Sequence, residues 1–225
     1  RPVTGESSGP ETVTRAFRVA YDGREYAGFQ RQPHARTVAD ALLEALAEHG
    51  LVDRGDGSTH ATPPGYAAAG RTDAGVSAVA QTVAFEAPTW LTPRAFNGHL
   101  PGSVRVWAAA DVANDFHATH DAVPRALVRR VVAAARAVGR GTADLAWIDR
   151  LLAAEPVSGQ RGVGPAPPEP LVLWDVTYPD ASFTVDREAA ESARVAFGER
   201  HRDARHAAAA TGAVRDRLFS AVDEE

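Results

Sequence analysis

The chain of 225 residues contains no cysteine and no lysine. Without cysteine it forms no disulfide bond and offers no thiolate ligand to a metal. No apolar run approaches the length that a helix needs to cross a bilayer. The first residues do not combine a charged segment with an apolar run, as a secretory leader does. The sequence therefore predicts a cytoplasmic protein that does not span a membrane.

All 24 basic residues are arginine, and the formal net charge is −5. Arginine binds phosphate through a fixed fork and stacks on bases, which suits RNA binding. An Arg- and Ala-rich chain is also what a GC-rich genome encodes, and we favour that explanation for the bias. The net charge argues mildly against a polyanionic partner, although a local basic cleft can still bind nucleic acid.

Hydrophobic residues make up 44% of the chain, which is enough for a core in one or two domains. Apolar alternation and helical spacing predict its elements. The predicted strands lie around residues 17–21, 66–69, 79–85, 104–106, 116 and 171–174. Helices are predicted after a Thr37–Asp40 cap, after Thr92-Pro93 and over residues 187–222. For the last, charged helix we favour a solvated surface over an RNA-facing one. This order of elements is typical of an α+β fold with an antiparallel sheet.

The stretch from Gly70 to Ala78 combines a carboxylate, a guanidinium and two glycines just before a predicted strand. Arg71 can hold Asp73 ionised by charge pairing, and an ionised, oriented aspartate is a candidate nucleophile. Gly70 and Gly75 permit turns and a close approach of substrate to the backbone. An ordinary surface turn can have the same composition, so chemistry alone leaves both interpretations open.

This stretch resembles the signature loop of the TruA class of tRNA pseudouridine synthases, in its archaeal branch. Other motifs of that family follow in its order along the chain. They are Tyr21-Asp22-Gly23, Tyr26, Gly28-Phe29-Gln30-Arg31-Gln32, Thr37-Val38, Asn97, Leu100-Pro101, Val104-Arg105-Val106 and Asp115-Phe116-His117-Ala118. The resemblance extends from Ala16 to Ala122 and resumes from Leu127 to Pro179.

The resemblance implies an α+β pseudouridine synthase fold. Its antiparallel or mixed sheet consists of two pseudo-symmetric halves, with helices on one side and the active cleft between the halves. Composition and the resemblance together divide the chain into four parts. These are a disordered leader (1–14), rich in Gly, Ser, Thr and Pro, an N-terminal half with the catalytic loop (15–122), a remnant of the C-terminal half (123–180) and a helical charged tail (181–225).

The second half is incomplete relative to the family. After Ala122 the family continues through an Arg-x-Tyr-x-Tyr strand, a helix and further strands, whereas here Val123 leads within a few residues into its late helix. The tyrosines of the chain lie elsewhere, at Tyr21, Tyr26, Tyr66 and Tyr178. The family's active-site tyrosine, which stacks on the target base, therefore has no counterpart. The sequence therefore shows an apparent internal deletion near residue 123, and two explanations stay open: a real deletion, or a segment that the native protein has and this sequence lacks.

The resemblance implies isomerisation of uridine to pseudouridine at positions 38 to 40 of the tRNA anticodon arm, by a homodimer. Asp73 would be the nucleophile, supported by Arg71 and Arg129. The substrate contacts would be Gly70, Thr72, Gly75, Phe29, Gln30, Arg31, His117 and Leu171. Ordinary alternatives stay open for several: a solvated helix arginine for Arg129, a simple loop for residues 29–31, a structural role for His117 and core packing for Leu171.

The sequence predicts neither a metal nor a nucleotide cofactor. His117 and His120 lack a third ligand at metal-binding spacing, and no Gly-rich phosphate loop is present. The implied isomerisation is redox-neutral and adds no group, so it needs no cofactor.

Two other functions compete with this interpretation. One is an RNA-binding relative that lost turnover together with the missing segment. The other is a glycoside-cleaving hydrolase, which would need a second carboxylate roughly 5–10 Å from Asp73. Asp22 beside Arg24 predicts a turn rather than that second carboxylate.

Overall fold

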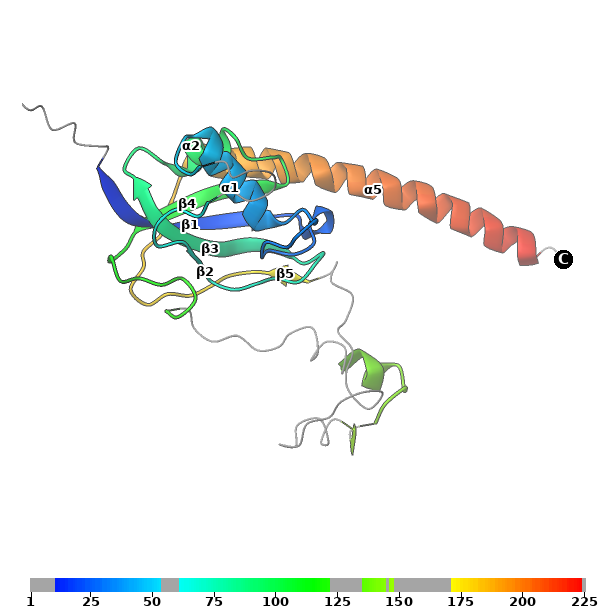
Figure 1. The fold of residues 1–225 in the computed structure, drawn as a ribbon. Helices are drawn as coiled ribbons and strands as arrows, with labels where there is room; N and C mark the ends of the chain where they lie inside the picture. Colours follow the sequence, from blue (N-terminus) through cyan, green and yellow to red (C-terminus); the bar gives the residue numbers. More distant parts are fainter. Residues whose placement is uncertain (1–10, 54–60, 122–134, 145, 148–170, 224–225) are drawn as a thin grey trace, which may run out of the picture.

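The computed structural model describes residues 11–53, 61–121, 135–144, 146–147 and 171–223, with the side chains of 214–223 left out. Figure 1 shows a single sheet with helices packed on one side and a long helix that extends beyond it. Arg129 and most of the predicted C-terminal remnant before Leu171 lie outside the described residues.

The sheet is built around strand β1 (Thr12–Tyr21), which pairs antiparallel with β3 (Ser77–Pro88) on one side and β4 (Val104–Asp111) on the other. Two short strands, β2 (Ala67–Ala68) and β6 (Thr184–Val185), extend the order to β2-β3-β1-β4-β6. Strand β5 (Val172–Leu173) pairs parallel with the start of β3. The predicted α+β class with an antiparallel sheet is therefore confirmed.

Helices α1 (Val38–Glu48) and α2 (Pro93–Asn97) cover one face of the sheet (Figure 1). Alternation along β1 sends Phe17 into the core beneath them. Its ring stacks on Phe85 with centroids 5.2 Å apart and meets the edge of Phe96 at 5.4 Å. Leu42 and Leu46 of α1 are fully buried in the same core. This packing fixes β1 and β3, the strands that support the candidate site.

The opposite face of the sheet buries a charged side chain. Arg18 is 8% exposed and lies over the ring of Phe183, 4.1 Å from its centroid. Its guanidinium also pairs with Asp175 at 2.9 Å and donates to Thr82 Oγ1 at 3.2 Å. A buried cation needs such partners, so residues 175–183 are held against this face of the sheet.

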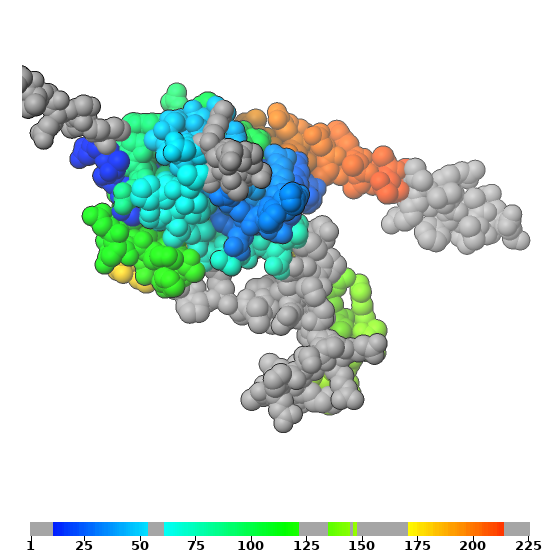
Figure 2. Space-filling model, in the orientation of Figure 1, coloured from blue at the N-terminus to red at the C-terminus, as the bar shows by residue number. Residues whose placement is uncertain are grey.

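The last helix, α5 (Arg187–Asp223), confirms the prediction of a helical tail. Its first turns contact β4 and α2, where Ala189 and Ala193 are buried. From His201 to Ala213 its side chains are exposed or half-exposed. Figure 2 shows this part projecting from the rest of the molecule.

Three local predictions are corrected by the structure. Strand β1 begins at Thr12, inside the segment predicted as leader. Phe116 is not in a strand, because its residue lies in the turns after β4 and its ring packs on Tyr178 instead. The predicted buried strand at 171–174 is only a two-residue edge strand, with Val172 48% and Trp174 75% exposed.

The predicted start of α1 is confirmed by a reciprocal cap. Thr37 Oγ1 accepts from the Asp40 backbone N–H, and the Asp40 carboxylate accepts from the Thr37 backbone N–H, both at 3.2 Å. Thr37 is fully buried, so no water replaces a lost partner.

We expect Thr37→Ala to lower the free energy of unfolding by about 1–2 kcal/mol, because capping hydroxyls contribute on this scale. Urea denaturation measures the change. Thr211→Ala on α5 is the control: its hydroxyl only donates back to the Ala207 carbonyl within an exposed helix, where alanine is the better helix former. Equal losses in the two variants would contradict the assigned cap.

Among the described residues, no helix has both the length and the apolar character to cross a bilayer.

Candidate functional site

The signature loop joins β2 to β3 and is held from several sides. Gln81 Nε2 donates to the Gly70 carbonyl at 2.7 Å, and the Tyr21 and Thr72 hydroxyls share a hydrogen bond of 2.8 Å. The Phe29 N–H donates to the Thr72 carbonyl at 3.0 Å. Because these partners come from β1, β3 and the segment after β1, the loop has a fixed place at the end of the sheet.

Glycine is required at two positions: one in the turn around Asp73, and one in the segment after β1 that packs against this turn. Gly75 has φ +79°, and its N–H donates to the Tyr26 carbonyl at 3.2 Å, while the Val76 N–H closes the turn on the Asp73 carbonyl at 3.1 Å. Gly28 has φ +113°, and a Cβ there would lie 3.0 Å from the Thr72 carbonyl oxygen. The turn role predicted for Gly75 is therefore supported, whereas Gly70 has an ordinary φ and open space around it.

Asp73 and Arg71 are both exposed on this loop. The structure does not join them: within the part of the chain that it describes, no ion pair links the two side chains. An exposed carboxylate on a well-held turn remains accessible to a substrate, and Arg71 is not its charge partner here.

Leu171 and His117 lie close to the two ends of the loop region. The Leu171 carbonyl accepts from the Ser77 N–H at 3.3 Å, directly where the loop enters β3. The turn that carries His117 is tied to β2 because the Thr119 hydroxyl donates to the Ala68 carbonyl at 2.5 Å. His117 is exposed, and its ring lies 4.2 Å from that of His120. Among the described residues, no group of three or more His, Cys, Asp or Glu side chains could hold a metal.

The segment after β1, residues 29–31, exposes fewer side chains for contact with a substrate than its sequence suggests. Phe29 is 2% exposed and packs 6.1 Å from the ring of Tyr21, so its ring belongs to the core and is not free to stack on a base. Its backbone N–H contacts the signature loop at the Thr72 carbonyl, and the role of Phe29 as a substrate contact stays a prediction. Gln30 is exposed, and Arg31 is half-buried with an ion pair of 3.2 Å to Asp40.

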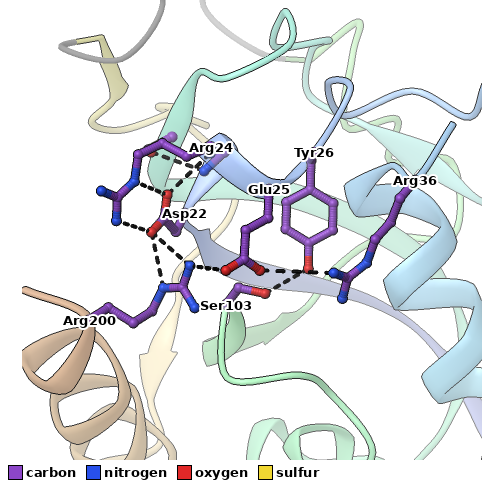
Figure 3. Close-up of polar contacts among 9 residues, drawn as sticks. Asp22, Arg24, Glu25, Tyr26, Arg36, Ser103 and Arg200 are labelled. Carbon is purple, nitrogen blue, oxygen red and sulfur yellow. Dashed lines mark hydrogen bonds and ion pairs between the residues drawn. The ribbon is translucent and has the colours of Figure 1, made fainter. Parts of the chain in front are cut away.

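A charged network beside the loop is not evident from the sequence (Figure 3). Asp22 follows the last residue of β1 and caps the 3₁₀ turn η1 (Gly23–Glu25), which confirms the predicted turn. Arg24 donates to its carboxylate from Nε at 2.9 Å and from Nη2 at 2.5 Å. Arg200 of α5 reaches the same carboxylate and that of Glu25. Only the Asp22–Arg24 spacing gave a local signal, because Arg200 is 178 positions away.

The Arg24 guanidinium lowers the pKa of Asp22 to about 2, with a further contribution from Arg200. The ordinary carboxyl pKa of the unfolded chain is higher, so this charge stabilises the fold fully only above about pH 4. The contribution disappears as the pH falls toward 2. Arg24 is 48% exposed, and solvent screening keeps the contribution near 1 kcal/mol.

We therefore expect Asp22→Asn to destabilise the protein at about pH 6 by ~1 kcal/mol more than at about pH 2.5. Chemical denaturation at the two pH values measures the difference. A deficit that does not change with pH would show that the Asp22 charge contributes nothing to stability.

Comparisons with known proteins point to one family. A family model described as tRNA pseudouridine synthase matches residues 103–179. A tRNA pseudouridine synthase A of Natronomonas pharaonis is 46% identical over 89% of this chain and 98% of its own length. A protein of the same name from Haloarcula marismortui is 43% identical over 91% of this chain and 100% of its own length. Another, from Thermococcus kodakarensis, is 29% identical over 83% of this chain and 92% of its own length.

The lengths of these alignments bear on the missing segment. The first two extend over 267 and 278 residues, more than the 225 of the chain. Each therefore contains positions of the relative that have no counterpart here. This agrees with an internal deletion.

Proposed function

This chain belongs to the tRNA pseudouridine synthase A family, and on that premise we propose that it isomerises uridine to pseudouridine in the anticodon arm of tRNA, with Asp73 as the acting carboxylate. The observation that carries the proposal is the 46% identity that extends over 98% of a relative with that name. The exposed Asp73 on a firmly held turn supports the chemical role.

The reaction exchanges one bond of the nucleoside for another. The bond between N1 of uracil and C1′ of the ribose breaks, the base rotates, and C5 bonds to C1′. C5 loses its proton, and N1 gains one, so atoms and electrons balance without a co-reactant. The nucleotide must leave its stack to be reached. A carboxylate can assist as a nucleophile at C1′ or C6, or as a base at the 2′ position.

The remaining site residues take roles around this carboxylate. We propose that Arg71 binds a phosphate of the RNA, since its exposed fork is not paired with Asp73. Arg129 remains the proposed cation beside Asp73. The other proposed contacts are Gly70, Thr72, Gly75, Phe29, Gln30, Arg31, His117 and Leu171. The proposed working unit is a homodimer in the cytoplasm. Light scattering on the purified protein tests whether it is a dimer.

A hydrolase is the weaker alternative. A glycosidase needs a general acid whose pKa is raised. Asp22, the carboxylate that the sequence places near the site, has its pKa lowered to about 2 by Arg24. It stays ionised at neutral pH and cannot donate a proton to a leaving group.

An RNA-binding relative without turnover is the stronger alternative, because the chain lacks positions that its relatives have. Release of tritium from tRNA labelled at C5 of uridine distinguishes the two, since only isomerisation frees that hydrogen. We expect release that grows with time and enzyme concentration. Binding of the same tRNA without release would favour the inactive relative.

A further inference from the structure

We propose that Arg200 of α5 is a positioning residue for the signature loop, acting through Asp22 and Glu25. This inference rests on the proposed function only where it predicts catalytic rates. The conformational part stands on the contacts alone.

Arg200 joins the tail helix to the end of β1 (Figure 3). Its Nε donates to Asp22 Oδ2 at 3.0 Å, and its Nη2 lies 3.0 Å from the same oxygen while also donating to Glu25 Oε1. One planar fork thus spans two carboxylates on the η1 turn. Asp22 is only 7% exposed, so the contact is made at a largely buried group. Bidentate contacts of this kind fix geometry as well as charge.

The η1 segment lies directly against the end of the signature loop. The Gly23 N–H donates to Ser77 Oγ at 3.0 Å. A Cβ on Gly23 would be 2.1 Å from the Val76 carbonyl oxygen, which shows how closely the two backbones approach. At the other end of the turn, the Tyr26 carbonyl accepts from the Gly75 N–H. A shift of η1 therefore moves residues 75–77.

The carbonyl of Asp73 closes the same turn by accepting from the Val76 N–H at 3.1 Å. The path from α5 to the candidate nucleophile consists of Arg200, the η1 carboxylates, Gly23 and the Gly75–Ser77 backbone. Each step is a hydrogen bond or a backbone contact. This is the short, contiguous network that coupling between two sites requires.

Charge explains why Arg200 matters for this geometry. Asp22 keeps Arg24 as a second partner, whereas the ion pair that Glu25 keeps among the described residues is the longer one to Arg36, at 3.9 Å. Without Arg200, the two carboxylates on one short turn repel each other with less compensation. Since the Arg200 side chain is 26% exposed, we expect a small effect on global stability and a larger one on the local position of η1.

The test compares Arg200→Ala with Arg194→Ala in the full chain. Arg194 is on the same helix and pairs only with Glu191, one turn away, in the described contacts. We expect Arg200→Ala to lower the single-turnover rate on tRNA about tenfold, because small misplacements of reacting groups are costly. The dissociation constant for tRNA stays within about twofold, which a general loss of fold would not allow.

Hydrogen exchange of the amides of Gly23, Gly75 and Val76 gives a second readout that needs no activity. We expect these amides to exchange about threefold to tenfold faster in Arg200→Ala, with no change in Arg194→Ala. Arg200→Lys keeps the charge but not the fork, so we expect intermediate values.

The outcomes separate the two proposals. If Arg200→Ala matches Arg194→Ala in both rate and exchange, the positioning role is wrong. If the unsubstituted chain binds tRNA without isomerising it, the proposed function fails, and exchange alone decides the positioning role.

Discussion

Replacing Asp73 by asparagine is expected to lower the rate of pseudouridine formation by about 10⁴-fold or more, because the amide keeps the shape but loses the negative charge that the chemistry uses. Asp73 is exposed on a turn that the Val76 N–H closes by donating to its backbone carbonyl, and the substitution keeps that hydrogen bond. The substitution therefore leaves the fold intact. We expect tRNA affinity to change by less than about threefold, since other groups bind the tRNA equally in the ground state and the transition state.

Single-turnover kinetics and a tRNA binding titration measure the two quantities. Asp203→Asn is the matched control, because this carboxylate is exposed on α5, within the part from His201 to Ala213 that projects from the rest of the molecule. It should match the unsubstituted chain in both measurements. An Asp73→Asn variant with a normal rate would remove Asp73 from the mechanism.

Gly23→Ala is expected to have the second largest effect, on both stability and rate. The added Cβ would lie 2.1 Å from the Val76 carbonyl oxygen and 2.9 Å from the Ser77 nitrogen, which are backbone atoms. Neither can rotate away, so η1 or the loop must move. We expect the free energy of unfolding to fall by about 2–4 kcal/mol, as for other overpacked sites. The rate of the folded fraction should fall by about 10²-fold, because the loop carrying Asp73 is displaced.

Gly102→Ala is the control, since nothing lies within 4 Å of a Cβ at that position. An alanine there should change stability by less than about 0.5 kcal/mol or raise it slightly. Urea denaturation and single-turnover rates of both variants provide the comparison. Equal behaviour of the two alanine variants would mean that the close approach of Gly23 to the loop has no functional consequence.

Much of the N-terminal half follows from local sequence. Alternation at Phe17 and Tyr21 identifies β1, and the Thr37–Asp40 pair identifies the start of α1, because each signal depends only on nearby residues. Gly75 is likewise predictable, since its positive φ is an intrinsic preference of glycine.

Other features depend on contacts that no local pattern encodes. Phe29 lies in a polar segment, yet its ring fills the core beside Tyr21. The Arg71–Asp73 pair predicted from spacing does not form, because the direction of a side chain on a turn depends on the tertiary hydrogen bonds that hold the turn. The contact of Arg200 with Asp22 joins residues 178 positions apart.

Strand β5 shows a third kind of difference. Its apolar residues suggested a buried strand, but Val172 and Trp174 are largely exposed. A sheet edge covers an apolar side chain only if another strand or helix packs there. In the described part of the chain, β5 pairs with β3 and has no second neighbour.

The proposed activity is tested by locating pseudouridine in an unmodified tRNA transcript after incubation with the purified chain. We expect pseudouridine to accumulate in the anticodon arm, at positions 38 to 40, and the Asp73→Asn variant to leave these uridines unchanged. A transcript that binds the chain but contains no pseudouridine after prolonged incubation would contradict the proposed activity.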